Sequence, residues 1–489
     1  MQVSACVRCA EKPQYGGTLR VELRATSMTL NPARWKAGSQ DFATNERLAA
    51  LVFDRLVALD SYGRFQPELA TEWSHDGSGK RWQFTLRPGV KFSDGSALTA
   101  TDVVSALRAV LPRGMQISAT ASGVAVVAAT PATDLLELLS SGAYFIYRDD
   151  GERGLIGTGA FVLESQRASA TSSGSADRLR FRFNEKCWAG RPFVDAIEVS
   201  LGVPPLKALL DLQLGKTDLG ELSADTARRA EQSNIRLWMS APVTLYALKF
   251  TGPAKSANER AVREALRLSV DRMAMARVLL QKQAEPAASF LPQWISGYAF
   301  LFEMESNLER AKSIRTSLPA NSTGVGQALR VSMDAGSDVA RLLAERVAVN
   351  ARAAGLTVQV VARVKAGAAA DGTAGKPESD AQLIGWRYST ISPMKELPDL
   401  AFALKQEIPD SSATMDAEAR YAWEKRMMDE MNTLPLVVVP DFAGLDGRVR
   451  NWSAAAWGEW HLADVWIHQV ETTAGAGEAA TSSQAGAKP

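Results

Sequence analysis

The sequence predicts an α/β protein with mixed sheets and more than one domain. The chain has 489 residues, whereas a single hydrophobic core stops growing at roughly 250–300 residues. Alternating apolar residues in Arg81–Leu86 predict a β-strand, and a strand–helix–strand pattern lies between Leu329 and Val361. With 46% hydrophobic and 22% charged residues, the composition is that of an ordinary folded protein. Strands that alternate with helices over this length indicate the α/β class.

In the N-terminal half, the pattern predicts a strand at Thr18–Leu23 and, later, a two-stranded ribbon followed by a helix. Apolar residues alternate in Arg81–Leu86 and again in Val90–Phe92, on either side of a Pro-Gly turn. Thr99 then offers a capping side chain to a helix, whose apolar residues recur at helical spacing as far as Leu111.

In the C-terminal half, Leu329–Met333 predicts a strand, Asp338–Ala354 a helix and Leu356–Val360 a second strand. Gly355 fits the left-handed position that ends such a helix. A strand, a helix and a strand of these lengths predict a right-handed parallel crossover. The remaining predicted elements are a strand at Gln382–Gly385, which ends at Trp386, and helices at Ala261–Leu280 and Tyr421–Met431.

The two ends of the chain have no periodic pattern. Residues 1–15 are expected to be a leader or a flexible terminus, and the Ala/Gly/Ser/Thr-rich residues 471–489 a disordered tail. Two internal stretches of similar composition, 168–176 and 366–379, are expected to be surface loops. Val3-Ser4-Ala5-Cys6 has the form of a bacterial lipidation signal at Cys6. Only five residues precede this cysteine, so lipidation requires an apolar segment further upstream.

Charge and composition exclude several classes of function. The chain has 55 basic and 54 acidic side chains, which gives no basic field for a nucleic acid. No apolar stretch approaches the roughly 18 residues that a membrane-spanning helix needs. Three cysteines and three histidines, without a zinc-ligand pattern, indicate no metal site. We therefore expect no metal, no cofactor and no nucleic-acid partner.

Catalytic signatures are also missing. Gly77–Lys80 has the composition of a phosphate loop but lacks its first glycine and its closing Ser or Thr, so we interpret it as a hairpin turn. Gly475–Ala480 matches the spacing of a dinucleotide-binding loop, but too few residues follow for the helix and strand of that motif. No Gly-x-Ser-x-Gly elbow occurs. We expect no catalytic residues and no enzymatic activity.

Tryptophan is the one residue type that points to a ligand. The chain has twelve tryptophans, and Trp35, Trp294 and Trp386 fall in or beside predicted loops. Most of the others are expected to be ordinary core residues. Aromatic rings on loops suit a concave site that recognises a small ligand by its apolar faces.

An ordered series of segments carries a resemblance to a known family. The strongest block runs from Trp82 to Gly95 and continues through Leu98–Val104. The other segments are Gly16–Leu19, Thr29–Pro32, Phe53–Asp60, Pro67–Trp73, Gly157–Phe161, Trp188–Phe193, Gly215–Asp218, Val262–Leu266 and Gly385-Trp386. Over residues 16–467 the chain resembles the bacterial extracytoplasmic solute-binding proteins of the peptide/nickel type, which serve ABC importers.

The resemblance implies a two-lobed periplasmic-binding-protein fold (type II) with an extra subdomain, mixed sheets and a hinge cleft. On this basis we expect lobe I to be discontinuous. The expected parts are residues 16–50 (lobe I), 51–177 (extra subdomain), 178–255 (lobe I), 256–434 (lobe II) and 435–470 (return to lobe I).

The resemblance also implies a ligand site around the end of the strand at Trp386. In peptide-binding members, an aspartate three residues after this tryptophan pairs with the ammonium group of the ligand. Ser389 stands at that position here, and a buried ammonium without a carboxylate is strongly disfavoured. The candidate ligand-binding residues are therefore Trp386, Arg387, Tyr388 and Ser389, with Asn31, Trp35 and Tyr246.

Arg387 has two interpretations. Its planar guanidinium suits a carboxylate or phosphate of a ligand, which would then be neutral or anionic at this point. Alternatively, Arg387 points to solvent or pairs with a carboxylate of the protein.

The leading functional hypothesis is a monomeric protein of the periplasm or cell envelope, with a possible lipid anchor at Cys6. It would bind a small or peptide-like solute by closure of its lobes and deliver it to the membrane permease of an ABC importer. Two alternatives remain open, namely a non-transporting envelope protein with a chaperone-like or structural role, and an enzyme with an unrecognised site. Ligand-induced closure separates the first two hypotheses, and substrate turnover would be needed for the third.

Overall fold

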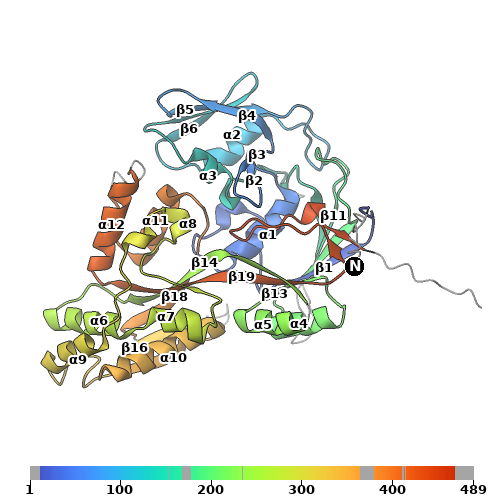
Figure 1. Cartoon of the computed structure of the whole chain (residues 1–489). Coiled ribbons are helices and arrows are strands. Elements are labelled where there is room, and N and C mark those ends of the chain that lie inside the picture. The colour runs from blue at the N-terminus through green and yellow to red at the C-terminus, as the bar shows by residue number, and fades with distance from the viewer. Residues whose placement is uncertain are drawn as a thin grey trace, which may run out of the picture.

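Two long strands, β14 (Arg236–Phe250) and β19 (Thr433–Leu445), connect the two halves of the molecule (Figure 1). The computed structural model describes residues 12–151, 154–167, 178–233, 235–363, 379–409, 412 and 415–468. One mixed sheet extends to either side of these strands. Its order is β10 (Phe161–Arg167), β11 (Arg178–Phe183), β12 (Ala196–Ser200), β1 (Thr18–Glu22), β13 (Leu219–Leu222), β19, β14, β18 (Ala381–Arg387), β16 (Leu329–Asp334) and β17 (Val358–Arg363), and β15 (Glu285–Pro286) also pairs with β19.

The two connecting strands change partners near their middle. The C-terminal end of β19 pairs with β13, whereas β14 pairs with β18 through Thr244–Phe250. The pairing between β14 and β19 is irregular from Met239 to Thr244, opposite Val439–Phe442. Bulges of this kind bend a strand and increase its local twist. We call the part with β1 and β10–β13 lobe I and the part with β16–β18 lobe II. The lobe boundaries expected at residues 255 and 434 stay a prediction.

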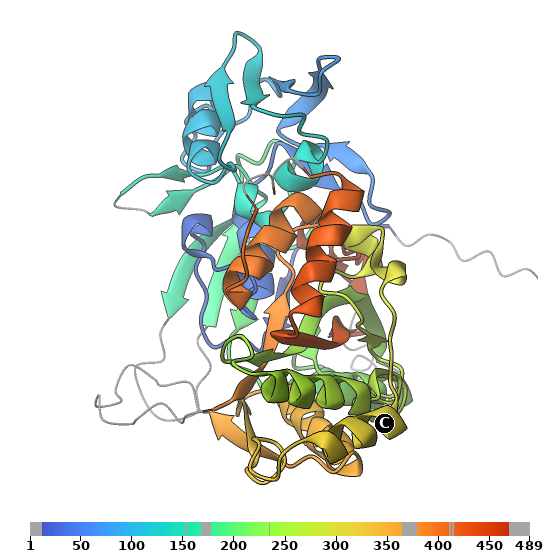
Figure 2. The ribbon, with the colours of Figure 1, turned by 90° about the vertical axis from the view of Figure 1, so that its left-hand side faces the viewer.

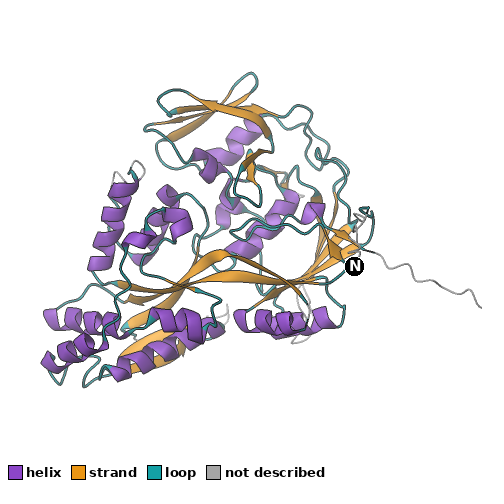
Figure 3. Cartoon of the chain, in the orientation of Figure 1, coloured by secondary structure: helices purple, strands orange, loops and turns teal. Residues whose placement is uncertain are grey.

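Helices cover both faces of the sheet (Figures 1 and 3). Below it, α4 (Pro205–Gln213) and α5 (Ala224–Gln232) of lobe I share one continuous apolar core with α6 (Ala257–Ser269) and α10 (Asp338–Ala353) of lobe II. Above it, α1 (Phe42–Val52) packs on lobe I. α8 (Gln293–Ser296), α11 (Pro393–Leu404) and α12 (Ala417–Asp429) pack on lobe II around a separate apolar cluster. α9 (Leu308–Ser317) lies against α6.

The extra subdomain lies above lobe I, on the opposite side of the molecule from α10 (Figure 2). It contains a four-stranded sheet in the order β4 (Ala70–His75), β5 (Arg81–Leu86), β7 (Gly123–Ala128) and β6 (Met115–Ala119). α2 (Ala100–Arg108) and α3 (Leu135–Leu139) share its core, and the short strands β2 (Val57–Leu59) and β3 (Phe65–Pro67) lie at its base.

The predicted ribbon of the extra subdomain is half wrong. β5 forms as expected, but it pairs with β4 and β7 rather than with Val90–Phe92. The latter segment closes a tight loop, in which Phe92 N donates to Ser96 O and Leu98 N donates to Val90 O. The helix that follows is confirmed, and Thr99 and Asp102 cap it reciprocally.

The strand–helix–strand prediction in lobe II is confirmed, because β16 and β17 are parallel and α10 connects them. The helix expected at Ala261–Leu280 is wrong as one element. α6 ends at Ser269, Val270 is extended, and Asp271 accepts a hydrogen bond from Ala274 N to cap the short helix α7 (Arg272–Ala274). A capping aspartate inside an apolar pattern starts a new helix rather than continuing the old one.

No helix among the described residues is long and apolar enough to cross a bilayer. The described residues also contain no group of three His, Cys, Asp or Glu side chains that could hold a metal ion. Residues 1–11 of the expected leader, which include Cys6, the loop 168–176, most of 366–379 and the tail 471–489 lie outside the described residues.

Candidate functional site

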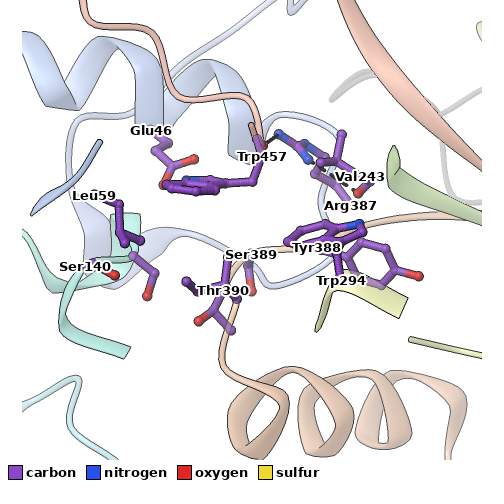
Figure 4. Close-up of a pocket in the computed structure, with 12 residues that line it drawn as sticks. Glu46, Leu59, Ser140, Val243, Trp294, Arg387, Tyr388, Ser389, Thr390 and Trp457 are labelled. Atoms are coloured by element: carbon purple, nitrogen blue, oxygen red, sulfur yellow. Dashed lines mark hydrogen bonds between the residues drawn. The ribbon is translucent and has the colours of Figure 1, made fainter. Parts of the chain in front are cut away.

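A cavity lies above the irregular part of β14, where side chains of lobe I, lobe II and the extra subdomain meet (Figure 4). Its volume is about 340 Å³, which includes space open to solvent. The lobes are closed on each other, because Gly38 of lobe I lies in direct contact with Trp386 and Arg387 of lobe II. The lining residues are Glu46, Leu59, Ser140, Ser141 and Trp457 on one side, and Val243, Trp294, Arg387, Tyr388, Ser389, Thr390 and Ile391 on the other.

The segment after β18 is held by one buried carboxylate, that of Glu396 in the first turn of α11. Its Oε2 accepts hydrogen bonds from Ser389 N, Ser389 Oγ and Thr390 N, at 3.0, 3.0 and 3.1 Å. Its Oε1 accepts from Trp386 Nε1 at 2.6 Å. Burial raises the pKa of Glu396 to about 7. The Ser389 hydroxyl is therefore turned back into the protein, and the nearby carboxylate already has four donors.

Trp386 is placed away from the cavity. Its side chain is only 6% exposed, and Gly38 of lobe I lies directly against the ring. Arg387 N also donates to Gly38 O, at 3.2 Å. The structure therefore gives this tryptophan a role in the contact between the lobes, and its contact with ligand stays a prediction.

Arg387 lines the cavity and pairs with a carboxylate of the protein. Its Nη2 lies 3.1 Å from Asp441 Oδ2 and donates to Trp457 O at 2.9 Å. Its Nη1 donates to Val243 O at 3.4 Å. This is the second of the two interpretations of Arg387, in which a protein carboxylate neutralises it. The sequence did not identify Asp441, because 54 positions separate it from Arg387.

The aromatic wall of lobe II is fixed from behind. Trp294 Nε1 donates to Pro242 O at 2.9 Å, and the Tyr388 hydroxyl donates to Phe290 O at 2.6 Å. The two rings meet edge to face with centroids 6.4 Å apart. Because the indole N–H of Trp294 and the hydroxyl hydrogen of Tyr388 are already donated to the protein, neither residue has a hydrogen-bond donor left for a ligand, and both offer ring surfaces.

The segments on either side of α8, the helix that carries Trp294, are held by a second buried carboxylate, Glu424 of α12. Its Oε1 accepts from Phe290 N and Leu291 N at 2.5 and 3.1 Å, and its Oε2 accepts from the Tyr298 hydroxyl at 2.9 Å. Burial raises the pKa of Glu424 to about 7. Sequence reasoning missed both buried glutamates, although Glu396 lies on the same helix face as the apolar Leu397 and Leu400.

The opposite wall contains a buried charge cluster. Arg55 pairs with Glu459 at 2.7 Å and with Glu46 at 3.5 Å. Burial and the charge of Glu459 raise the pKa of Glu46 to about 7, against the opposing effect of Arg55. Glu46 is therefore the titratable group of lobe I at the cavity wall.

A further contact joins the extra subdomain to lobe II. The hydroxyl of Ser392, the residue before α11, donates to the carboxylate of Asp134, the residue before α3. Burial raises the pKa of Asp134. This hydrogen bond joins the extra subdomain to lobe II outside the lining of the cavity, and it must break when these two parts separate.

The other candidate residues lie outside the cavity. Asn31 Oδ1 caps a short turn by accepting from Ala33 N at 3.0 Å. Trp35 Nε1 donates to Thr29 O at 2.9 Å and its ring packs on the core of lobe I. Tyr246 belongs to the core below the sheet. The structure brings none of these three residues into the cavity, and their contact with ligand stays a prediction.

Replacing Glu424 by glutamine should flatten the pH dependence of stability. A carboxyl group whose pKa is raised on folding binds more protons in the folded state, so the free energy of unfolding falls as pH rises from about 4.5 to about 7. Glutamine can accept from both backbone N–H groups and donate to the Tyr298 hydroxyl. Between about pH 5 and about pH 8 the free energy of unfolding should fall by roughly 2–3 kcal/mol less in the variant than in the wild type. Urea unfolding at both pH values measures this, and parallel curves would contradict it.

The comparisons with known proteins agree with this architecture. The model for bacterial extracellular solute-binding proteins, family 5 (middle), matches residues 64–404. The nickel-binding periplasmic protein of Escherichia coli is 26% identical over 264 residues, which are 48% of this chain and 49% of that protein. The peptide transport periplasmic protein SapA of Salmonella typhimurium is 24% identical over 311 residues, 54% of this chain and 55% of that protein. The matches thus span about half the length of these curated relatives.

Solved structures match over nearly the whole chain. The oligopeptide-binding protein AppA of Bacillus subtilis, in complex with a nonapeptide, has a TM-score of 0.74 at 16% identity and covers 94% of this chain and 100% of that one. NikZ of Campylobacter jejuni, in complex with Ni(L-His), has a TM-score of 0.71 at 17% identity and covers 92% and 99%. These likenesses confirm the predicted fold class, and the family match confirms the resemblance. The chain belongs to the family 5 bacterial extracellular solute-binding proteins.

Proposed function

We propose that this protein captures a small solute in the cavity between its lobes and delivers it to the membrane permease of an ABC importer. The single observation that supports this most directly is the cavity itself, which is walled by both lobes at the point where the two connecting strands bend. A ligand that contacts both walls stabilises the closed form by its differential affinity for that form. We also propose a periplasmic or envelope location and a monomeric state, with Cys6 as the site of a lipid anchor.

The polar groups at the cavity limit the class of solute. Ser389 and Glu396 satisfy each other, so no free carboxylate is present at the position where peptide-binding relatives are expected to hold an ammonium. Arg387 is neutralised by Asp441, yet its buried Nε has no hydrogen-bond partner among the described residues. We propose a solute that is neutral or anionic at this point, offers a hydrogen-bond acceptor, and has apolar faces for Trp294 and Tyr388.

The proposal is tested by solute isolated with the protein. Protein purified from its own cell envelope is denatured, and the released compounds are identified by mass spectrometry. Small-angle scattering of stripped protein, with and without that compound, should show a more compact bound form. A verified, saturating compound that leaves the scattering unchanged would favour a non-transporting envelope role instead.

A dipeptide with a free amino group should bind weakly. Desolvation of its ammonium has no carboxylate to offset it at Ser389. In calorimetric titrations, unmodified Met-Leu should have a dissociation constant above about 1 mM, only about −4 kcal/mol of binding free energy. The N-acetylated dipeptide serves as the control without the charge. Micromolar binding of the unmodified form would contradict the proposed character of the cavity.

A further inference from the structure

Asp441 occupies the bend between the lobes and joins one arginine from each. It lies in the irregular part of β19, where the partner strand changes register. Its Oδ2 is 2.6 Å from Arg47 Nη2, on α1 of lobe I, and 3.1 Å from Arg387 Nη2, at the end of β18 of lobe II. The side chains of Arg47 and Arg387 are 1% and 3% exposed and that of Asp441 is 17% exposed, so the arginine ends of both ion pairs are shielded from solvent. One carboxylate thus bridges two elements that must move apart when the cavity opens.

The same two arginines also hold a wall of the cavity. Arg47 Nε donates to Gly458 O and Arg387 Nη2 donates to Trp457 O, both at 2.9 Å. Gly458 has φ +109°, and a Cβ there would lie 2.6 Å from Arg387 Nη2 and 3.1 Å from Asp441 Oδ2. The chain therefore passes directly over the ion cluster, and the Trp457 side chain projects from it into the cavity (Figure 4).

The charge on Asp441 is maintained in spite of burial. Burial alone would raise the pKa of this carboxyl group, but the nearby charges of Arg387 and Arg47 lower it below its usual value. Arg47 has a second carboxylate within lobe I, Glu221, at 3.2 Å. No other carboxylate pairs with Arg387 among the described residues. Loss of Asp441 therefore affects Arg387 of lobe II more than Arg47 of lobe I.

We propose that Asp441 is a positioning residue that couples the cavity to lobe closure: it ties Arg47 of lobe I to Arg387 of lobe II, and the two arginines together hold Trp457 in the wall. The inference rests on the proposed function, because it assigns a conformational role within the same site. A ligand that touches Trp457 or Arg387 then favours the arrangement in which both ion pairs are intact, which is the closed one.

The chain offers a matched control for a merely structural role. Asp218, with a side chain 1% exposed, also lies between two arginines, Arg20 and Arg448, each at 2.8 Å. Arg20 is on β1 and Asp218 directly precedes β13, both in lobe I, and Arg448 follows β19, the strand that returns to lobe I. Asp218→Asn removes the same kind of buried charge without touching the junction between the lobes.

The experiment compares Asp441→Asn with Asp218→Asn in the ligand-free full chain. Spin labels are attached at Tyr62 of the extra subdomain and Phe402 of lobe II, 82% and 76% exposed, after the cysteines are replaced by serine. Distance distributions are measured by pulsed electron resonance, and stability by denaturant unfolding. Asp441→Asn should reduce the closed population by about tenfold relative to the wild type. Asp218→Asn should lower stability and leave the distances unchanged.

Arg387→Met provides a second variant if Asp441→Asn does not fold. It removes only the ion pair between Asp441 and lobe II and keeps the pair between Asp441 and Arg47. The distance distribution should shift in the same direction as in Asp441→Asn. Distances equal to the wild type in both variants, or an equal shift in Asp218→Asn, would overturn the inference. Because the measurement needs no ligand, its failure leaves the solute-binding proposal intact. If no solute is found, the solute-binding proposal fails, but the distances expected for the ligand-free variants stay the same.

Discussion

Replacement of Glu396 by alanine should lower the free energy of unfolding by about 3–5 kcal/mol, the largest loss expected for a single side chain at the cavity. The substitution leaves Trp386 Nε1, Ser389 N and Thr390 N without an acceptor, and Trp386 and Thr390 are buried. A buried donor left unpaired costs about 1–3 kcal/mol. The loss of these bonds also frees the segment 387–391, so any solute should bind more weakly.

Glutamine at position 396 tests the reason for the loss. Oε1 of Glu396 accepts from the indole of Trp386, and Oε2 accepts from two backbone N–H groups and a hydroxyl. In either orientation the amide nitrogen of glutamine would face donors. The carbonyl oxygen of glutamine can replace Oε2 and keep three of the four donors, so Glu396→Gln should be destabilised by the unpaired Trp386 Nε1, by less than Glu396→Ala, whereas Glu424→Gln should be tolerated. Denaturant unfolding of the three variants decides this, and a Glu396→Gln protein as stable as the wild type would contradict it.

The parts of the fold that the sequence predicted are those fixed by short-range pattern. The reciprocal cap at Thr99, the alternation in β5 and the strand–helix–strand unit ending at β17 each depend on neighbours within one or two elements. The family resemblance added what local pattern lacks, namely the two lobes and the strand end near the cavity. The predicted pairing of Val90–Phe92 with β5 was wrong, because alternation alone does not say which strand is the partner.

The arrangement of the site could not be predicted because distant residues decide it. The contact of the Trp386 ring with Gly38, more than 300 residues away in the sequence, could not be predicted, and the contact of Trp386 with ligand stays a prediction. Ser389 stands where the resemblance predicts a carboxylate, and in the structure its hydroxyl donates to a carboxylate of the next helix, that of Glu396. Arg387 was given two interpretations, and only the fold brings Asp441 to it. The determining contacts of Trp386 and Arg387 are made with residues far away in the sequence, Gly38 and Asp441, whereas Ser389 meets a carboxylate seven residues further along the chain.

Replacement of Gly38 by alanine is the second substitution for which we expect a large loss of stability. Its φ is +73°, and a Cβ would lie 2.0 Å from Trp386 Cε3, well inside contact distance. Gly63 has a nearly identical φ of +77° with nothing within 4 Å of its Cβ position. Alanine at either position carries the same backbone cost of roughly 1–2 kcal/mol. The difference between the two variants therefore isolates the collision with the tryptophan ring.

Gly38→Ala should be about 2–4 kcal/mol less stable than Gly63→Ala, because overpacking of a ring that cannot move is the added term. The Trp386 ring is fixed by its hydrogen bond to Glu396 and by the pairing of β18 with β14. The collision has one inexpensive relief, since Gly38 belongs to lobe I and Trp386 to lobe II: the lobes can separate. Small-angle scattering should then show a more open ligand-free form for Gly38→Ala than for Gly63→Ala, and denaturant unfolding should show the loss of stability.

If the two variants have the same stability and the same radius of gyration, Gly38 does not limit the approach of the lobes. If stability falls without opening, the ring contact is structural and the closure of the cavity depends on other contacts, of which Ser392 with Asp134 is the next to test.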